Sequence, residues 1–488
     1  MSKQYIRIPL FAAAVISLGL TTAGHSLAGA LPQRSQTKQL VEGQYTENLE
    51  AASFFQQGVT RYNRGDYKAA ESALRKALQL DPSIGMAYYL LGNSLLEQGQ
   101  TELAVEQYQR AISLNPIMSE AHYNLGLALY RQGDTEGAIS EYQRALTLNP
   151  SLAPARYNLG LVYEGQGRVG DAIAQYKEAI RLNPSYSTAQ YNLALLMAKQ
   201  DQTAPAITTL QQVVSANPKF AQAQYQLGVL QAKQGQLQEA RETLKTATGL
   251  DPKFAPAQFQ LGVVYAQLGA YGAASNRFRD VTILEPNNVE ANKLLGASLV
   301  QSEKYDEAVN ALHTAIRLDP NDAQTHYNLG VALQKTEKYP DAIAQYRQAI
   351  ALNPRLSNAY YSLGVALDKS QQREEAISSL MEAKRLFTQE GNQQKLSELD
   401  QYVQSLTGQP TVQPTVQPTI QPTIQPTEPA TSQPTQSPPL TPQQIFSPQP
   451  APLNNNLPQP TAPNNRLPQP APLNNRLPQP TAPNNGSR

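Results

Sequence analysis

Apolar residues in this chain recur at helical spacing in short stretches, and each stretch is followed by a second one after a turn. In the segment from residue 119 to residue 150, the first stripe is Tyr123, Leu125, Leu129 and Tyr130, and the second is Ile139, Tyr142, Ala145 and Leu146. This spacing indicates amphipathic helices. Gly133-Asp134 separates them, and glycine suits the left-handed residue that follows a helix. Asn149-Pro150 ends the second helix, because a residue before proline is pushed out of the α region. The pattern predicts a helix pair.

The helix pair repeats every 34 residues without an insertion. The period is marked by nine prolines: Pro82, Pro116, Pro150, Pro184, Pro218, Pro252, Pro286, Pro320 and Pro354. If this proline is position 32 of each repeat, position 8 is glycine in nine of ten repeats, position 20 is always alanine and position 24 is Leu, Tyr or Phe. A fixed period of roughly 20–50 residues is typical of a solenoid. The small residues at positions 8 and 20 are expected to face each other and let the two helices approach closely.

These residues resemble the tetratricopeptide repeat family. Its pattern of Leu-Gly at positions 7–8, Ala at 20, an aromatic residue at 24, Ala at 27 and Pro at 32 lies over residues 51–390 in ten tandem copies. The chain departs from the pattern in having no tryptophan, so position 4 carries Phe, Tyr, His, Arg, Gln or Asn. The resemblance implies an all-α fold, a right-handed solenoid superhelix of helix-turn-helix repeats. Residues 391–407 are predicted to form a C-terminal capping helix.

The N-terminal end differs in composition from the repeats. Lys3 and Arg7 precede a short apolar run, and Ala28-Gly29-Ala30 offers a small-x-small cleavage site. Residues 1–30 are therefore predicted to be a signal peptide, with an uncleaved N-terminal membrane anchor as the alternative. Residues 31–50 are a polar leader. The chain contains no cysteine, which excludes disulfides and thiolate metal sites.

The C-terminal end, residues 408–488, is rich in Pro, Gln, Thr and Asn. It contains 22 of the 37 prolines and only four charged residues. Such a composition cannot bury enough apolar surface to offset the entropy of chain ordering, so a disordered tail is predicted. A spacer, an O-glycosylated segment and a ligand for a proline-binding module remain alternative roles.

No sequence motif points to catalysis. The chain has no H-E-x-x-H, no P-loop and no alternating βα pattern. Of the four histidines, His122 and His326 occupy position 4, where a structural role is expected. Removal of residues 1–30 changes the net charge from +1 to −1, which leaves no electrostatic footprint for nucleic acid. We therefore predict no enzymatic activity, no cofactor, no metal, no small-molecule substrate and no nucleic-acid partner.

Two positions form rows along the repeats. Position 5 is aromatic in nine repeats and position 6 is an amide in seven. The family resemblance implies that the first helix of each pair lines an inner groove, where an asparagine row holds an extended peptide by its backbone. An amide suits this role because it offers both a donor and an acceptor. The candidate residues are Asn124, Asn158, Asn192, Asn328, Tyr123, Tyr157, Tyr191 and Tyr327. The alternative is that both rows serve only packing between repeats.

The sequence therefore predicts an exported scaffold or assembly factor that binds a protein or peptide in its groove. The expected location is periplasmic, lumenal or extracellular, with membrane attachment only if the N-terminal segment is uncleaved. Two other roles remain open. The chain could be the substrate-recognition subunit of a separate enzyme, or a cell-surface structural protein that acts through its Pro-rich tail.

Overall fold

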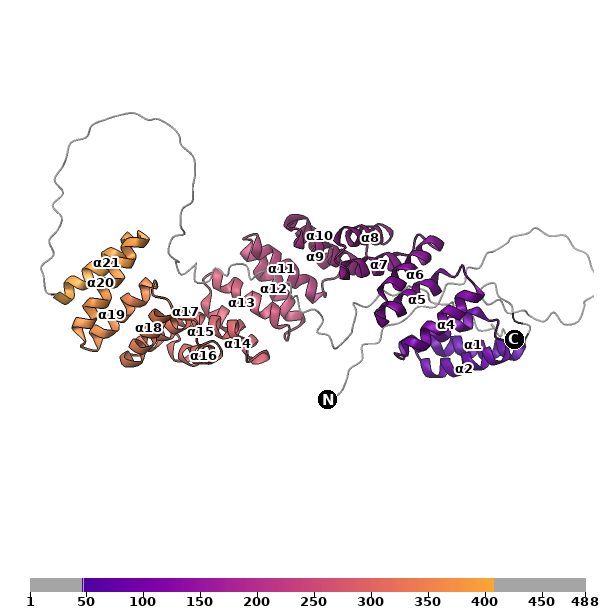
Figure 1. The fold of residues 1–488 in the computed structure, drawn as a ribbon, viewed down its shortest axis with the longest axis horizontal. Helices are drawn as coiled ribbons and strands as arrows, with labels where there is room; N and C mark the ends of the chain where they lie inside the picture. The colour runs from indigo at the N-terminus through magenta and orange to yellow at the C-terminus, as the bar shows by residue number, and fades with distance from the viewer. Residues whose placement is uncertain (1–45, 47, 408–488) are drawn as a thin grey trace, which may run out of the picture. The chain divides into compact units, whose positions relative to one another are not determined.

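The computed structural model describes residue 46 and residues 48–407, which form 21 helices and no strand (Figure 1). The all-α solenoid class is thereby confirmed. The predicted signal peptide, nearly all of the leader and the Pro-rich tail lie outside the described residues. The described chain divides into two compact units, which meet in sequence at Ala216 and Asn217.

Each repeat contributes one odd-numbered and one even-numbered helix. Unit 1 contains α1 (Leu49–Asn63), α2 (Tyr67–Leu80), α3 (Gly85–Glu97), α4 (Thr101–Leu114), α5 (Ser119–Gln132), α6 (Thr135–Leu148), α7 (Ala153–Gly165), α8 (Val169–Leu182), α9 (Ser187–Lys199) and α10 (Thr203–Ala216). Unit 2 contains α11 (Ala221–Lys233), α12 (Leu237–Leu250), α13 (Ala255–Gln267), α14 (Tyr271–Leu284), α15 (Val289–Gln301), α16 (Tyr305–Leu318), α17 (Ala323–Lys335), α18 (Tyr339–Leu352), α19 (Ser357–Lys369), α20 (Arg373–Glu390) and α21 (Gln393–Thr407).

The turn inside each helix pair contains a left-handed residue at position 15. Glycine occupies it in six repeats, as at Gly133 with φ of 87°. Four repeats place a side chain there, namely Asp201, Glu303, Glu337 and Gln371, with φ between 58° and 61°. A left-handed backbone costs a residue with a Cβ roughly 1–2 kcal/mol. These four turns are held by the packing of the helices on either side.

Glycine at position 8 makes room for the side chain at position 24. A Cβ built on Gly160 would lie 2.6 Å from Cε1 of Tyr176, and the other position-8 glycines meet Tyr, Leu or Phe at similar distances. The expectation that positions 8 and 20 face each other is therefore wrong in its detail. Position 20 is fully buried in every repeat, but it approaches glycine through its backbone, with Ala138 O 3.2 Å from the Cβ position of Gly126.

The connection between repeats is held by hydrogen bonds around the proline. In seven of these connections the side chain at position 31 accepts from the backbone N–H two residues later, as Asp81 does from Ser83 at 2.9 Å. The polar side chain at position 4 reaches the carbonyl of the preceding proline, as in Gln190 Nε2 to Pro184 O at 3.0 Å. The same contact is made by His122, Gln224, Gln258, Asn292 and His326. Position 4 therefore satisfies a loop carbonyl where the family has tryptophan.

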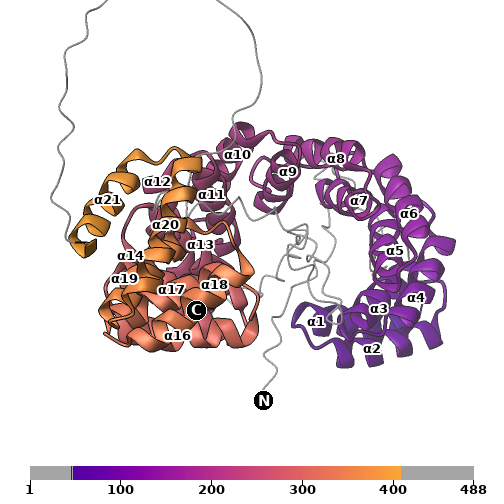
Figure 2. The same cartoon turned by 60° about the vertical axis from the view of Figure 1, so that its left-hand side comes forward.

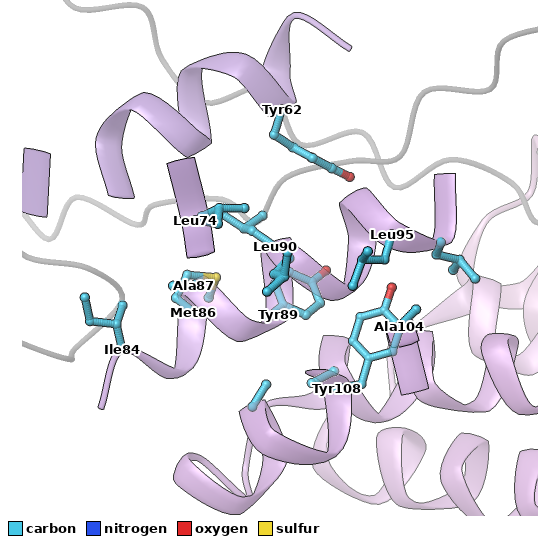
Figure 3. Packing of buried hydrophobic residues seen from close by; sticks show 14 of the residues in the cluster. Tyr62, Leu74, Ile84, Met86, Ala87, Tyr89, Leu90, Leu95, Ala104 and Tyr108 are labelled. Atoms are coloured by element: carbon cyan, nitrogen blue, oxygen red, sulfur yellow. The ribbon is translucent and has the colours of Figure 1, made fainter. Parts of the chain in front are cut away.

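The apolar core is shared between neighbouring repeats. Figure 3 shows Tyr62, Leu74, Tyr89 and Tyr108, from four consecutive helices, meeting in one cluster. The rings of Tyr89 and Tyr108 lie 6.2 Å apart, and both side chains are almost fully buried. Because each repeat completes the core of the next, no repeat is expected to be stable alone.

The odd-numbered helices of unit 1 lie on the inner side of an arc and the even-numbered helices on its outer side (Figure 2). Consistently, α1 contacts α3, α3 contacts α5 and α5 contacts α7. We call the surface formed by α1, α3, α5, α7 and α9 the inner face of unit 1. In unit 2, α21 covers the last repeat, where Tyr402 Oη donates to Asp368 Oδ2 at 2.8 Å.

The glycine contact predicts the outcome of two substitutions in one repeat. Gly160→Ala should lower the free energy of unfolding by about 1–2 kcal/mol, because the added methyl group meets the ring of Tyr176 and overpacks the helix contact. Gly170→Ala, early in α8, adds its methyl group in open space and should stabilise the helix by about 0.5–1 kcal/mol. Chemical denaturation followed by circular dichroism measures both. Equal effects of the two substitutions would contradict the close helix approach.

Candidate functional site

The predicted asparagine row of unit 1 forms hydrogen bonds to tyrosines of the preceding repeat. Asn124 Nδ2 donates to Tyr89 Oη at 3.2 Å, and Asn158 Nδ2 donates to Tyr123 Oη at 3.1 Å. Asn192 Nδ2 donates to Tyr157 Oη at 3.2 Å. We call these three contacts the Asn–Tyr ladder. Each one joins position 6 of a repeat to position 5 of the repeat before it.

Two of the three ladder asparagines are buried, which corrects the expectation that their amides are exposed. Asn124 is 3% exposed and Asn158 is 2% exposed, whereas Asn192 is half-buried. An amide has two N–H donors and an acceptor oxygen, so it is the burial of Asn124 and Asn158, more than their bonds to phenols, that keeps these amides from a ligand. The first two amides therefore link repeats, and the third is the accessible member of the ladder.

The predicted tyrosine row is also mostly internal. Tyr123 and Tyr157 are 4% and 1% exposed, and their rings lie 6.0 and 5.8 Å from those of Tyr142 and Tyr176. Burial raises the pKa of both phenols, despite the hydrogen bonds that they accept from asparagine. Tyr191 is half-buried and remains a candidate for ligand contact.

Unit 2 places its candidate residues differently. Asn328 Oδ1 accepts from Gln324 Nε2 at 3.0 Å, one turn earlier on the same helix. Tyr327 is half-buried, with its ring 5.9 Å from that of Tyr346. Position 5 of this repeat therefore packs against an aromatic ring as in unit 1, but position 6 does not form the Asn-to-Tyr hydrogen bond of the ladder.

Lys293 is the one exception to the aromatic row, and the structure explains it. In two other repeats the ring at position 5 packs against a ring at position 34, as in Tyr225 and Phe254 with centroids 5.0 Å apart. In repeat 8 these positions are Lys293 and Asp322, and Lys293 Nζ lies 3.2 Å from Asp322 Oδ1. Burial alone would raise the pKa of Asp322, but hydrogen bonds from Thr325 and the charge of Lys293 lower it. An ion pair thus replaces a ring pair.

The inner face of unit 1 also carries charged side chains at positions 12 and 13. These residues are not among the asparagines and tyrosines that the sequence predicted as the binding site. Glu164 Oε2 accepts from Tyr176 Oη at 2.8 Å, and Lys199 Nζ lies 3.8 Å from Glu164 Oε1. Arg131 and Glu97 are half-buried at position 13 of neighbouring repeats. Together they give this face both signs of charge.

Glu97 is the most perturbed carboxyl on this face. Burial raises the pKa of its carboxyl to about 7, and the positive charge of Arg131 offsets part of this increase. Among residue 46 and residues 48–407, the side chain of Glu97 has no hydrogen-bond or ion-pair partner. It is therefore a half-buried carboxyl with unused acceptor capacity.

No group of three or more His, Cys, Asp or Glu side chains within residues 46 and 48–407 could hold a metal ion. Of the helices that the structure describes, none is both long and apolar enough to cross a membrane.

Family models of the tetratricopeptide repeat match most of the repeat region. Models described as tetratricopeptide repeat match residues 55–112, 89–153, 198–253, 231–298 and 357–389. A model described as TPR repeat matches residues 165–201, 296–337 and 335–371. A search of curated proteins gave no match.

Several solved structures are similar to part of the chain. YrrB, described as a TPR protein with an unusual peptide-binding site, is 27% identical with a TM-score of 0.35, covering 38% of this chain and 96% of that chain. PilF of Pseudomonas aeruginosa is 25% identical with a TM-score of 0.40, covering 43% and 95%. MamA from Desulfovibrio magneticus RS-1 is 24% identical with a TM-score of 0.33, covering 35% and 96%.

The Asn–Tyr ladder predicts a stability cost for a substitution inside it. Asn158→Ala should lower the free energy of unfolding by about 1–3 kcal/mol, because it leaves the buried Tyr123 hydroxyl without its donor. Asn192→Ala should cost less, since water can reach that half-buried site. Urea denaturation measures both variants. In a Tyr123→Phe background, Asn158→Ala should lower the free energy of unfolding by less than it does in the wild type. An equal loss in both backgrounds would show that the Asn158–Tyr123 hydrogen bond is not the cause.

The raised pKa of Glu97 predicts how stability changes with pH. A carboxyl whose pKa is higher in the folded than in the unfolded chain stabilises the fold below the unfolded value and loses that contribution as pH rises through about 7. Between about pH 5 and pH 8, the denaturation midpoint should fall more for the wild type than for Glu97→Gln. Glu102→Gln, which changes an exposed carboxyl on the outer helix α4, should behave like the wild type.

Proposed function

Because the chain belongs to the tetratricopeptide repeat family, we propose that it is a non-enzymatic scaffold that binds a segment of another protein on the inner face of unit 1. The proposal includes export from the cytoplasm, which rests on the signal-like residues 1–30. An assembly factor outside the cytoplasm fits both features. N-terminal sequencing of the mature protein should then begin at Leu31.

The observation that carries the proposal is the polar character of the inner face between α5 and α9. Its half-buried side chains include an amide, a carboxylate and a guanidinium, contributed by Asn192, Glu164 and Arg131. Such a mixture matches the alternating donors and acceptors of an extended backbone. Several charged residues on the outer helices of unit 1 instead pair with a residue one turn away on the same helix, such as Arg181 with Glu178 at 2.9 Å.

The Asn–Tyr ladder supports this role indirectly. It joins α3 to α5, α5 to α7 and α7 to α9 through hydrogen bonds, of which the first two are buried. A rigid inner face loses little entropy when a partner binds, and preorganisation of this kind raises affinity. The ligand contacts themselves then come from Asn192, Tyr191 and the charged residues of positions 12 and 13.

A pair of matched variants tests the proposed surface. A partner recovered by affinity purification with the full-length chain should bind Asn192→Arg at least about 10-fold more weakly than the wild type, because the larger side chain fills the inner face. Ala174→Arg adds the same side chain at an exposed position of the outer helix α8 and should leave binding unchanged. Isothermal titration calorimetry measures both. If neither variant alters the affinity, the contact surface lies on the outer helices or in the Pro-rich tail.

A further inference from the structure

We propose that the inner face of unit 1 contains a subsite at Glu97 that binds a lysine or arginine side chain of the partner segment. This inference rests on the proposed function and makes it more specific. It states which chemical group of the partner is recognised and at which repeat.

The sequence sets Glu97 apart from the equivalent position of every other repeat. Position 13 is otherwise occupied by Asn63, Arg131, Gly165, Lys199, Lys233, Gln267, Gln301, Lys335 and Lys369. Glu97 is the only acidic residue in this row, and five of the other nine are basic. A packing role shared by all repeats would not place opposite charges at position 13. The acidic side chain of Glu97 is therefore a feature of repeat 2 alone.

The structure leaves the Glu97 carboxyl unsatisfied, unlike other half-buried carboxyls of the molecule. Glu164 accepts from Tyr176 Oη at 2.8 Å, and Asp322 lies 3.2 Å from Lys293 Nζ. Within residues 46 and 48–407, Glu97 has no comparable partner. A carboxylate withdrawn from water without a cation or donor is costly, and a cation brought by a ligand would remove that cost.

Three elements face Glu97 with titratable groups, and none of them neutralises it. Tyr62 of α1 and Tyr108 of α4 are phenols within electrostatic range, and among the described residues Arg131 of α5 is the only cation that acts on Glu97. Tyr108 Oη donates to Asn93 Oδ1 at 2.8 Å and is therefore committed elsewhere. Within residues 46 and 48–407, Arg131 acts on Glu97 through its charge but forms no ion pair with it.

The polar groups around Glu97 provide a second, independent observation. Tyr62 Oη and Asn93 Nδ2 are both buried, and neither has a hydrogen-bond partner among the residues that the structure describes. Asn93 lies one helical turn before Glu97 on α3 and is fully buried. Buried polar atoms are almost always satisfied in native proteins. Two unused polar atoms thus lie in repeats 1 and 2 near the unpaired carboxyl; Tyr62 Oη can accept a hydrogen bond from a cationic side chain, and Asn93 Nδ2 can donate one to a carbonyl.

The two charges of this region suit a basic residue within a peptide. The ammonium or guanidinium group would pair with Glu97, and Arg131 would donate to a backbone carbonyl of the same segment. Only the ionised form of Glu97 attracts a cation. Because burial raises the pKa of this carboxyl to about 7, binding should strengthen as pH rises through neutrality and weaken as pH falls.

Selection from a random dodecapeptide phage library tests the subsite with the full-length protein. At about pH 8.5, peptides selected on the wild type should share a lysine or arginine, and those selected on Glu97→Gln should not. A selected peptide should bind the wild type at least about 10-fold more tightly at pH 8.5 than at pH 5.5. Glu97→Gln should reduce this pH dependence, whereas Glu102→Gln should retain it.

The possible outcomes separate the two proposals. Glu97→Asp keeps a carboxylate and should still select basic peptides, which excludes a general effect of altering this position. Selection of peptides without a basic residue by the wild type would overturn the subsite and leave the peptide-binding function intact. If the wild type selects no peptide above the level of Asn192→Arg, both proposals are wrong.

Discussion

The close approach of two helices over a bare backbone is the contact on which this molecule depends. In nine repeats the side chain at position 24 lies against a glycine, at distances that leave no room for a methyl group. This contact fixes the angle and spacing of the helices within each pair. The spacing of the pairs then decides which residues reach the next repeat. The ladder and the inner face follow from that geometry.

Polar side chains at position 4 form hydrogen bonds where the family pattern has a tryptophan. Position 4 bonds the proline carbonyl of the connecting loop, and in several repeats it also bonds position 23 of the second helix, as His326 does with Gln345 at 2.7 Å. Such bonds add little net stability, but they leave a loop carbonyl satisfied and fix the loop in one conformation. At position 4 these repeats therefore use directional hydrogen bonds, where a tryptophan would bury a large apolar surface.

The sequence predicted the period, the helix pairs and the turn glycines because each depends on residues close together in the chain. It could not decide the role of the asparagine row. Asn158 and Tyr123 are 35 residues apart, and an amide row on one helix face is equally compatible with ligand binding and with contacts between repeats. The sequence also placed alanine at position 20 opposite the position-8 glycine, whereas in the structure the side chain at position 24 lies there, as Tyr176 does at Gly160. The sequence sets Glu97 apart only as the one acidic residue at position 13. Its burial depends on packing against α1 and α5 and cannot be predicted from the sequence of α3 alone.

The burial of tyrosines gives the molecule a built-in response to alkali. The chain has 25 tyrosines and no tryptophan, so phenols dominate its near-ultraviolet absorbance. Burial raises the pKa of Tyr62, Tyr108 and Tyr142 well above its ordinary value. These rings ionise in the unfolded chain at lower pH than in the folded one, so stability falls as pH rises past the unfolded pKa of about 10. Phenolate formation in these repeats is therefore coupled to their opening, and the change in absorbance that accompanies it reports the integrity of the array without an added probe.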